Sequence, residues 1–237
     1  MIKEEIDFKG FSLNGFLMLF ISIVVFAGCA YLLHLAVPKD NDLLIALSVT
    51  GIVLSLMTLP GYFALEPNEA LIMIFFGKYS GTFKNTGFYW VNPFYAKKKV
   101  SLRARNLDVE PIKVNDKIGN PVLIGLVLVW KLKDTYKAMF DIDAQTMASS
   151  GRTTTINNAV ASRMSAFENF VMIQSDAALR QVAGQYAYDD TEHNSNELTL
   201  RGGGEEINEQ LEQKLNERLA MAGMEVVEAR LNYLAYA

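Results

Sequence analysis

Of the 237 residues, 51% are hydrophobic, and 22 basic against 26 acidic side chains leave a net charge of −4. This balance lacks the basic footprint of a nucleic-acid-binding protein. The single cysteine excludes an intramolecular disulfide framework and thiolate metal clusters, and the two histidines, His34 and His193, lie far apart in the sequence.

Two long apolar stretches open the chain, at residues 13–37 and 43–63, and a polar break at residues 38–42 separates them. Neither contains a charged residue, and each can cross a hydrocarbon core of about 30 Å, which takes roughly 20 helical residues. Because the break is short, the two helices must run antiparallel. We therefore expect a transmembrane helical hairpin whose second helix packs closely through its small residues. These small residues are Ser48, Gly51 and Ser55.

Other interpretations of the first stretch fit less well. A cleaved signal peptide needs a positive start, whereas residues 1–9 carry three acids against two lysines. A lipidated Cys29 in a lipobox-like run is disfavoured because apolar residues continue beyond it. A buried soluble hairpin would show a polar face. We expect His34 at the headgroup level, and the alternative is a functional group inside the membrane.

Domain boundaries and orientation follow from the hairpin. We expect an N-terminal tail at residues 1–12, the hairpin at 13–63, and two subdomains at 64–120 and 121–237. The tail has two lysines and the connecting loop has only Lys39. The positive-inside rule then places both chain ends and the folded domain in the cytoplasm.

Short apolar runs indicate strands after the hairpin. Residues 70–76 are rich in β-branched and aromatic side chains and stop at a glycine, and a second such run covers 88–91. Residues 100–109 alternate between apolar and polar, as in a half-buried strand. Residues 122–132 are apolar on both faces, as expected for a central strand.

Helical patterns dominate the second half of the chain. Asp134 suits the N-cap of a helix over 135–142, and residues 160–188 mix three- and four-residue apolar spacings. A further helix over 205–222 follows three glycines, and an alternating strand at 227–233 closes the chain. This order predicts an α+β domain behind the transmembrane hairpin.

Several short motifs follow one another in a fixed order after Ala64. Residues 65–70 read Leu-Glu-Pro-Asn-Glu-Ala, residues 75–78 read Phe-Phe-Gly-Lys, and residues 87–94 run from a glycine through aromatic residues to Pro-Phe. In this order they resemble the opening of the SPFH (Band 7) domain of stomatins, prohibitins and flotillins, with a bacterial member expected. Weaker matches lie at residues 100–103, 117–132, 179–180 and 222–227.

The chain departs from that family pattern in three respects. The usual Thr-x-Asp before the long strand is Val-Asn-Asp, ending at Asp116, and residues 144–175 and 189–204 are longer than a compact member needs. No sustained heptad repeat follows the domain. Either a C-terminal coiled coil is missing from this sequence, or assembly relies on the domain itself.

Catalytic and metal-binding patterns are weak. The glycines at 202–204 and the segment 151–155 lack the Lys-Ser/Thr of a phosphate loop. Asp141 and Asp143 are better explained as the surface at a helix end, and His193 lies in a polar loop. We expect no catalytic site, no metal and no cofactor, and the resemblance likewise implies a scaffold and not an enzyme.

Aromatic and basic residues gather shortly after the hairpin, close to the expected membrane surface. Near an anionic leaflet each basic residue contributes about 1 kcal/mol of attraction. We hypothesise that this region enters the headgroup layer, and the alternative is an ordinary aromatic core with a solvated basic edge. The hypothetical membrane-interface residues are Phe83, Phe88, Tyr89, Trp90, Phe94, Tyr95, Lys97, Lys98, Lys99, Arg103 and Arg105.

Apolar residues of the last helix and last strand are candidates for self-association, because an exposed sheet edge readily pairs with a neighbour. The candidate residues are Ile207, Leu211, Leu215, Leu219, Val227, Leu231 and Tyr233.

The resemblance implies a membrane-anchored scaffold that self-associates and organises a membrane patch and its resident proteins. We expect a two-pass protein of a bacterial inner membrane whose partners are the lipid bilayer, further copies of itself and membrane-protein clients, without nucleic acid. The alternative is a regulatory partner of a membrane protease, as in prohibitins. A transport component ranks lower because the hairpin offers few polar groups, and the histidine count argues against a hydrolase.

Overall fold

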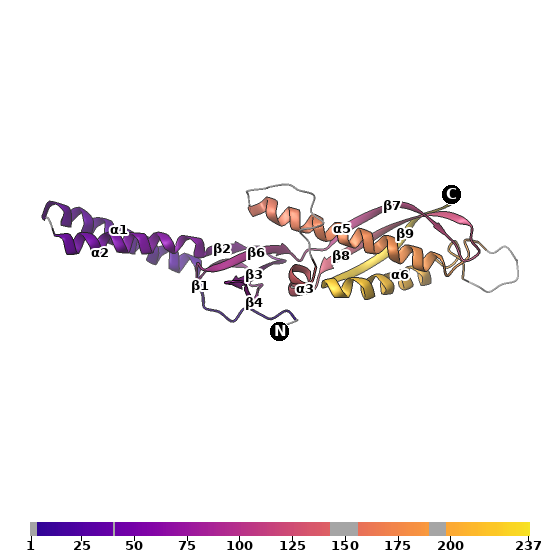
Figure 1. Ribbon diagram of the computed structural model, residues 1–237, viewed down its shortest axis with the longest axis horizontal. Coiled ribbons are helices and arrows are strands. Elements are labelled where there is room, and N and C mark those ends of the chain that lie inside the picture. The colour runs from indigo at the N-terminus through magenta and orange to yellow at the C-terminus, as the bar shows by residue number, and fades with distance from the viewer. Residues whose placement is uncertain (1–3, 40, 143–155, 190–197) are drawn as a thin grey trace. The chain divides into compact units, whose positions relative to one another are not determined.

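The computed structural model describes residues 4–39, 41–142, 156–189 and 198–237. Two compact units divide the chain: one is Ile6–Lys99, and the other joins Met1–Glu5 to Val100–Ala237. We call them the anchor unit and the distal unit; Figure 1 labels most of their helices and strands.

The division between the units falls at residue 99, whereas the sequence led us to expect a subdomain boundary at residue 120. Residues 100–120 lie in the distal unit because β7 (Arg105–Asn115) pairs antiparallel along β8 (Pro121–Leu132). The strand expected over 100–109 is also divided: β6 (Tyr95–Ser101) ends before β7 begins. An alternating pattern does not reveal such a break, because each half alternates by itself.

Two apolar helices begin the anchor unit. They are α1 (Gly15–Ala36) and α2 (Asp42–Met57), joined through the 3-10 turn η1 (Val37–Lys39), and they lie side by side in Figure 1. The side chain of Asn14 caps α1 by accepting from the N–H groups of the first turn. Most of their large apolar side chains are exposed. This argues against the core hairpin of a soluble protein, in which apolar side chains would be buried.

Small residues set the contact between the two helices, as expected. Ser48 and Ser55 of α2 are buried. A Cβ atom placed on Gly51 would lie 2.4 Å from the Sγ atom of Cys29 on α1. Glycine at position 51 therefore leaves room for this sulfur at the observed helix spacing.

Two three-stranded sheets complete the anchor unit, with strand orders β1-β5-β2 and β4-β3-β6. Residues 62–63, expected at the end of the second helix, instead begin β2 after the turn η2 (Leu59–Gly61). The core between the sheets consists of Leu65, Leu71, Met73, Phe83 and Val91. The strands not bounded above are β1 (Ser12–Asn14), β2 (Tyr62–Leu65), β3 (Glu69–Phe75), β4 (Lys78–Phe83) and β5 (Gly87–Val91).

One antiparallel sheet of order β7-β8-β9 forms the framework of the distal unit, with β9 (Met224–Tyr236) at one edge. As expected, β8 is the central strand. The long helices α5 (Ile156–Ala183) and α6 (Gly204–Leu219) contact each other and the sheet. The short helix α3 (Thr135–Phe140) follows β8, capped by Asp134 as expected, and the turn η3 (Ala220–Ala222) leads into β9.

Candidate membrane interface

Two segments of the anchor unit, Gly15–Lys39 and Asp42–Gly61, are long and apolar enough to cross a membrane. Serine hydroxyl groups of this hairpin bond to the Tyr62 hydroxyl at the start of β2 and to the backbone of the hairpin itself. Ser22 Oγ lies 2.8 Å from the hydroxyl of Tyr62, and Ser55 Oγ donates to the backbone oxygen of Ser22 at 3.2 Å. Since lipid offers no hydrogen-bond partner, such mutual bonds allow polar side chains close to the apolar region.

Side chains from the sheets bind the carbonyl groups at the end of α2. Trp90 Nε1 on β5 donates to the backbone oxygen of Thr58 at 2.9 Å, and Lys97 Nζ on β6 donates to the backbone oxygen of Pro60. A cation at a helix C-terminus complements the helix dipole, a contribution of about 0.3–1 kcal/mol. The Nζ atom of Lys97 also lies 5.9 Å from the ring centroid of Phe63, and partial burial lowers the pKa of Lys97. The sheets therefore hold the hairpin by its end.

Aromatic rings surround the same junction. The ring of Phe88 stacks on that of Tyr62 with centroids 5.7 Å apart, and it meets the ring of Phe16 edge-on at 5.1 Å. A Cβ atom on Gly15 would lie 2.4 Å from the ring of Phe88, so the start of α1 lies directly against this ring. Aromatic side chains at the end of a membrane helix suit the headgroup level.

A second aromatic group lies at the turn between β3 and β4, and the sequence analysis missed it. Phe76 is 80% exposed and has a left-handed φ of +44°, beside Gly77 at +85°. Its ring stacks on that of Phe94, which is 57% exposed, with centroids 6.3 Å apart. A bulky residue rarely adopts positive φ, and strain of this kind concentrates at functional sites. The signal was the Phe-Phe pair before Gly77, which we had assigned to a strand.

The structure sorts the expected membrane-interface residues into different environments. Phe83 is a core residue, contrary to the hypothesis, because β4 turns its ring toward β3 and β2. Lys99 forms an ion pair with Glu69 at 2.6 Å. Arg103 and Arg105 belong to the distal unit, so the basic residues do not form one patch within a unit. Phe94 is exposed, and the half-buried members of the set are Phe88, Tyr89, Trp90, Tyr95, Lys97 and Lys98.

The expected self-association residues also divide. The α6 stripe is fully buried within the distal unit, where α6 packs against β9 and α5, so these residues form core and offer no assembly surface. They are Ile207, Leu211, Leu215 and Leu219. On β9, Val227 and Tyr233 are exposed and Leu231 is half-buried.

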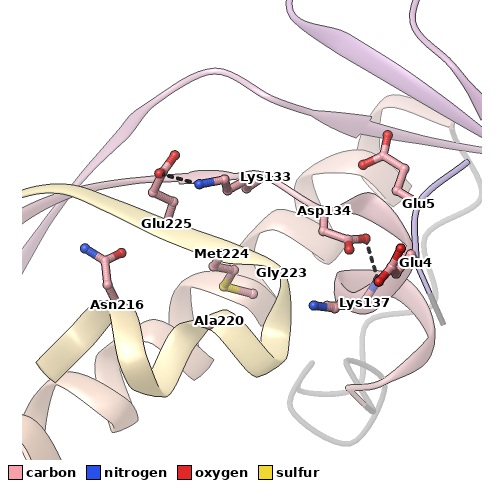
Figure 2. Close-up of a pocket in the computed structure, with 10 residues that line it drawn as sticks. All are labelled: Glu4, Glu5, Lys133, Asp134, Lys137, Asn216, Ala220, Gly223, Met224 and Glu225. Atoms are coloured by element: carbon pink, nitrogen blue, oxygen red, sulfur yellow. Dashed lines mark hydrogen bonds and ion pairs between the residues drawn. The ribbon is translucent and has the colours of Figure 1, made fainter. Parts of the chain in front are cut away.

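A pocket of about 570 Å³ lies in the distal unit, beside α3 and the start of β9, and Figure 2 shows the residues that line it. Its charged groups support the fold. Lys133 Nζ donates to Glu225 Oε1 at 2.8 Å, and this hydrogen bond lowers the pKa of Glu225 against a smaller opposing effect of burial. Asp134 accepts from the N–H groups of Tyr136 and Lys137. Among the described residues, no cluster of three or more metal-ligating side chains occurs here or elsewhere.

The remaining sequence candidates have structural roles or were not placed. Gly203 is the N-cap of α6, so the glycine run is a spacer before a helix. Asp141 is the C-cap of α3. The segment 151–155, Asp143 and His193 lie outside the described residues.

The comparison with protein families gives one match. The model of the SPFH domain / Band 7 family matches residues 63–236, from β2 into β9. No curated protein matches the chain.

Proposed function

Because the chain belongs to the SPFH domain / Band 7 family, we propose that it is a membrane-anchored oligomeric scaffold that organises a membrane patch and its resident proteins. Proteins of this family are generally membrane-associated, oligomeric and non-enzymatic. We further propose a two-pass protein of a bacterial inner membrane with its domain in the cytoplasm, since lysines flank the hairpin on the domain side.

One observation carries this proposal: the junction between the hairpin and the sheets. Trp90 and Lys97 bond the last carbonyls of the second span, and Phe88 packs against the start of the first. A flexible tether would need none of these bonds. They suit a scaffold, because they fix the sheets of the anchor unit on the hairpin of each copy.

The exposed aromatic pair supports a second contact with the lipid. On β6, Lys99 forms an ion pair with Glu69 at the start of β3. Two residues earlier on the same strand, Lys97 bonds the backbone oxygen of Pro60, between the second span and β2. Continuing in this direction brings Phe94, and Phe76 stacked on it, to the end of the sheet beside the hairpin. Exposed aromatic rings at this level favour insertion between headgroups.

For lateral assembly we propose the exposed face of β9 around Val227 and Tyr233. The buried stripe of α6 is not part of this surface. The test is the mass of the full-length protein in mild detergent, by mass photometry and electron microscopy. We expect large closed assemblies for the wild type and smaller particles for Val227→Asp. Glu228→Gln, an exposed change on the same strand, is the matched control.

A monodisperse monomer or dimer of the wild type would contradict the scaffold. A single membrane protease that co-purifies in fixed proportion would instead favour the alternative, a regulatory partner of that protease. A scaffold should retain lipid and a variable set of clients.

A further inference from the structure

The segment before the first span belongs to the β-structure of the anchor unit. The backbone oxygen of Ile6 accepts from Thr82 N at 2.8 Å, and Phe8 N donates to the backbone oxygen of Thr82 at 3.0 Å. Residues 6–8 therefore run parallel to β4 and pair with it through one bridge, between Asp7 and Thr82. Without them β4 is an edge of the sheet β4-β3-β6. We call residues 6–8 the N-terminal strap.

The contact surface on β4 fits this strap closely. Phe8 inserts its ring edge-on between the rings of Phe83, at 6.3 Å, and Tyr95, at 5.3 Å. Gly81 has φ of +129°, and a Cβ atom there would lie 2.7 Å from the Cα of Phe8. Glycine at position 81 thus allows an approach that any side chain would block.

A tyrosine reinforces the same contact. The hydroxyl of Tyr79 lies 2.7 Å from Thr82 Oγ1 and 3.3 Å from the backbone oxygen of Ile6. The two backbone hydrogen bonds, the ring of Phe8 and the hydroxyl of Tyr79 therefore hold the strap together. The backbone bonds use both outward backbone groups of Thr82.

The edges of the sheet β7-β8-β9 in the distal unit are protected in a different way. In the distal unit, Asn216 of α6 bonds both the N–H and the backbone oxygen of Val226 on β9. On β7, Pro111 lies at a bulge, where it weakens any further pairing. Those devices are built into the folded unit, whereas the backbone bonds of the strap to β4 are made to Thr82 alone, so the strap can leave its edge without unfolding the sheet.

An uncovered edge strand is a template for pairing with another chain. We propose that the strap protects β4 and keeps it from pairing with β4 of a second copy across a two-fold axis. This rests on the same anchor unit as the proposed function but concerns a contact that the wild type avoids, so the size of the wild-type assembly does not decide it.

The test compares Phe8→Ala with the matched control Phe11→Ala, which removes an exposed ring from the same tail. Amide hydrogen exchange of the full-length protein in detergent reports docking. We expect exchange at Thr82 about tenfold faster in Phe8→Ala, because local opening follows the loss of the anchor. Exchange in β3, the central strand of the same sheet, should not change, which shows that the anchor unit stays folded. Mass photometry should show a new species of twice the wild-type mass in Phe8→Ala alone.

A further substitution shows whether the new species forms through β4. Thr82→Pro in the Phe8→Ala background removes the outward N–H while an edge strand still tolerates proline. We expect it to restore the wild-type mass. The proposal is overturned if Thr82 exchange does not change in Phe8→Ala, if exchange rises without a change in mass, or if the doubled mass persists with Thr82→Pro.

Discussion

Trp90 contributes to the hairpin junction in two ways. Its indole N–H donates to the end of the second span at Thr58, and its ring stays half-buried beside the aromatic residues of the junction. An indole bonds its polar edge while its ring remains in an apolar environment, which suits the membrane–water boundary. Trp130, the second tryptophan, is fully buried in the distal unit. The two residues therefore give one chain a membrane probe and an internal control.

We expect lipids brominated near the headgroup to quench the fluorescence of Trp90 strongly in proteoliposomes of the Trp130→Phe variant. Replacing Trp130 with Phe breaks no hydrogen bond to the described residues, because the N–H of Trp130 finds no partner among them. The substitution therefore loses no hydrogen-bond contribution to stability. Trp130, measured alone in Trp90→Phe, should not be quenched. Equal quenching of the two residues would contradict the proposed interface.

Phe76 and Phe94 predict a separate effect on lipid contact. In the Trp130→Phe background, Phe76→Ser with Phe94→Ser should reduce quenching of Trp90 by shallow brominated lipids, because the second contact with the headgroups is lost. Stability should change little, since both changes remove exposed rings. Phe11→Ser, another exposed ring, is the control. Unchanged quenching would show that the hairpin alone sets the depth.

In the distal unit, the buried carboxylate of Asp116 joins two segments of the backbone. Its Oδ1 accepts from the N–H groups of Ile118, Gly119 and Asn120, and its Oδ2 accepts from Tyr188 N. Burial by itself would raise the pKa of Asp116, but the bonds from Tyr188 N, from the N–H and side chain of Asn120 and from Gly119 N together lower it below the usual value. The carboxylate thus joins the β7–β8 turn to the segment after α5.

Asp116→Asn should lower the free energy of unfolding by about 1–3 kcal/mol at neutral pH, because an amide NH₂ cannot accept from Tyr188. A lowered folded-state pKa stabilises the protein above the unfolded value of about 3.9, and this stability is lost as the pH falls through the folded pKa. We expect the melting temperature of the wild type to fall more than that of the variant between about pH 5 and pH 3. Parallel curves would rule out this role of the carboxylate.

At the scale of elements, the edge of β9 depends on α6. The Oδ1 atom of Asn216 accepts from Val226 N at 2.8 Å, and its Nδ2 donates to the backbone oxygen of Val226 at 3.1 Å. Asn208, on the same helix, accepts from Leu231 N. The apolar stripe of α6 fixes the helix on the sheet, and the two asparagines then occupy edge groups that a neighbouring strand would otherwise take.

Asn216→Leu should lower the free energy of unfolding by about 1–2 kcal/mol and promote aggregation, because it leaves both backbone groups of Val226 without this partner. Gln213→Leu, an exposed position on the same helix, should change stability by less than about 0.5 kcal/mol. Chemical denaturation with light scattering measures both effects. Equal behaviour of the two variants would mean that the asparagine contact is dispensable.

At the scale of the whole molecule, the chain enters and leaves its hairpin on one side. Residues 6–8 pair with β4, β1 precedes the first span, and β2 follows the second, all within one unit. The positions before and after the hairpin therefore share a compartment, and the turn η1 lies at the opposite end of the spans.

Cysteine labelling tests this topology in a Cys29→Ser background. A membrane-impermeant maleimide should label Lys39→Cys in intact cells and Lys84→Cys only after permeabilisation, if the domain is cytoplasmic. The reverse pattern would invert the proposed orientation, and labelling of both positions in intact cells would contradict a spanning hairpin.

Local patterns in the sequence specified the hairpin, the central strand β8, the long helices and the α+β class, but they did not specify the strands β1, β2 and β4. Long uncharged apolar stretches, helix caps and 3.6-residue spacing each depend on a few neighbouring residues. They can therefore be recognised in the sequence without knowledge of the fold. The small residues of α2 and the cap at Asp134 were predicted for the same reason.

Tertiary structure alone decided which apolar residues remain at the surface. Periodicity shows that Leu211 and Leu215 share a face, but it cannot show that β9 and α5 cover that face. Phe83 and Phe76 are chemically identical, yet a sheet buries one while a turn with positive φ exposes the other. The strap on β4 was likewise hidden, because it joins residues more than seventy positions apart. A side chain is buried by contacts with segments that are distant in the sequence, so the residues next to it in the chain do not reveal whether it is buried.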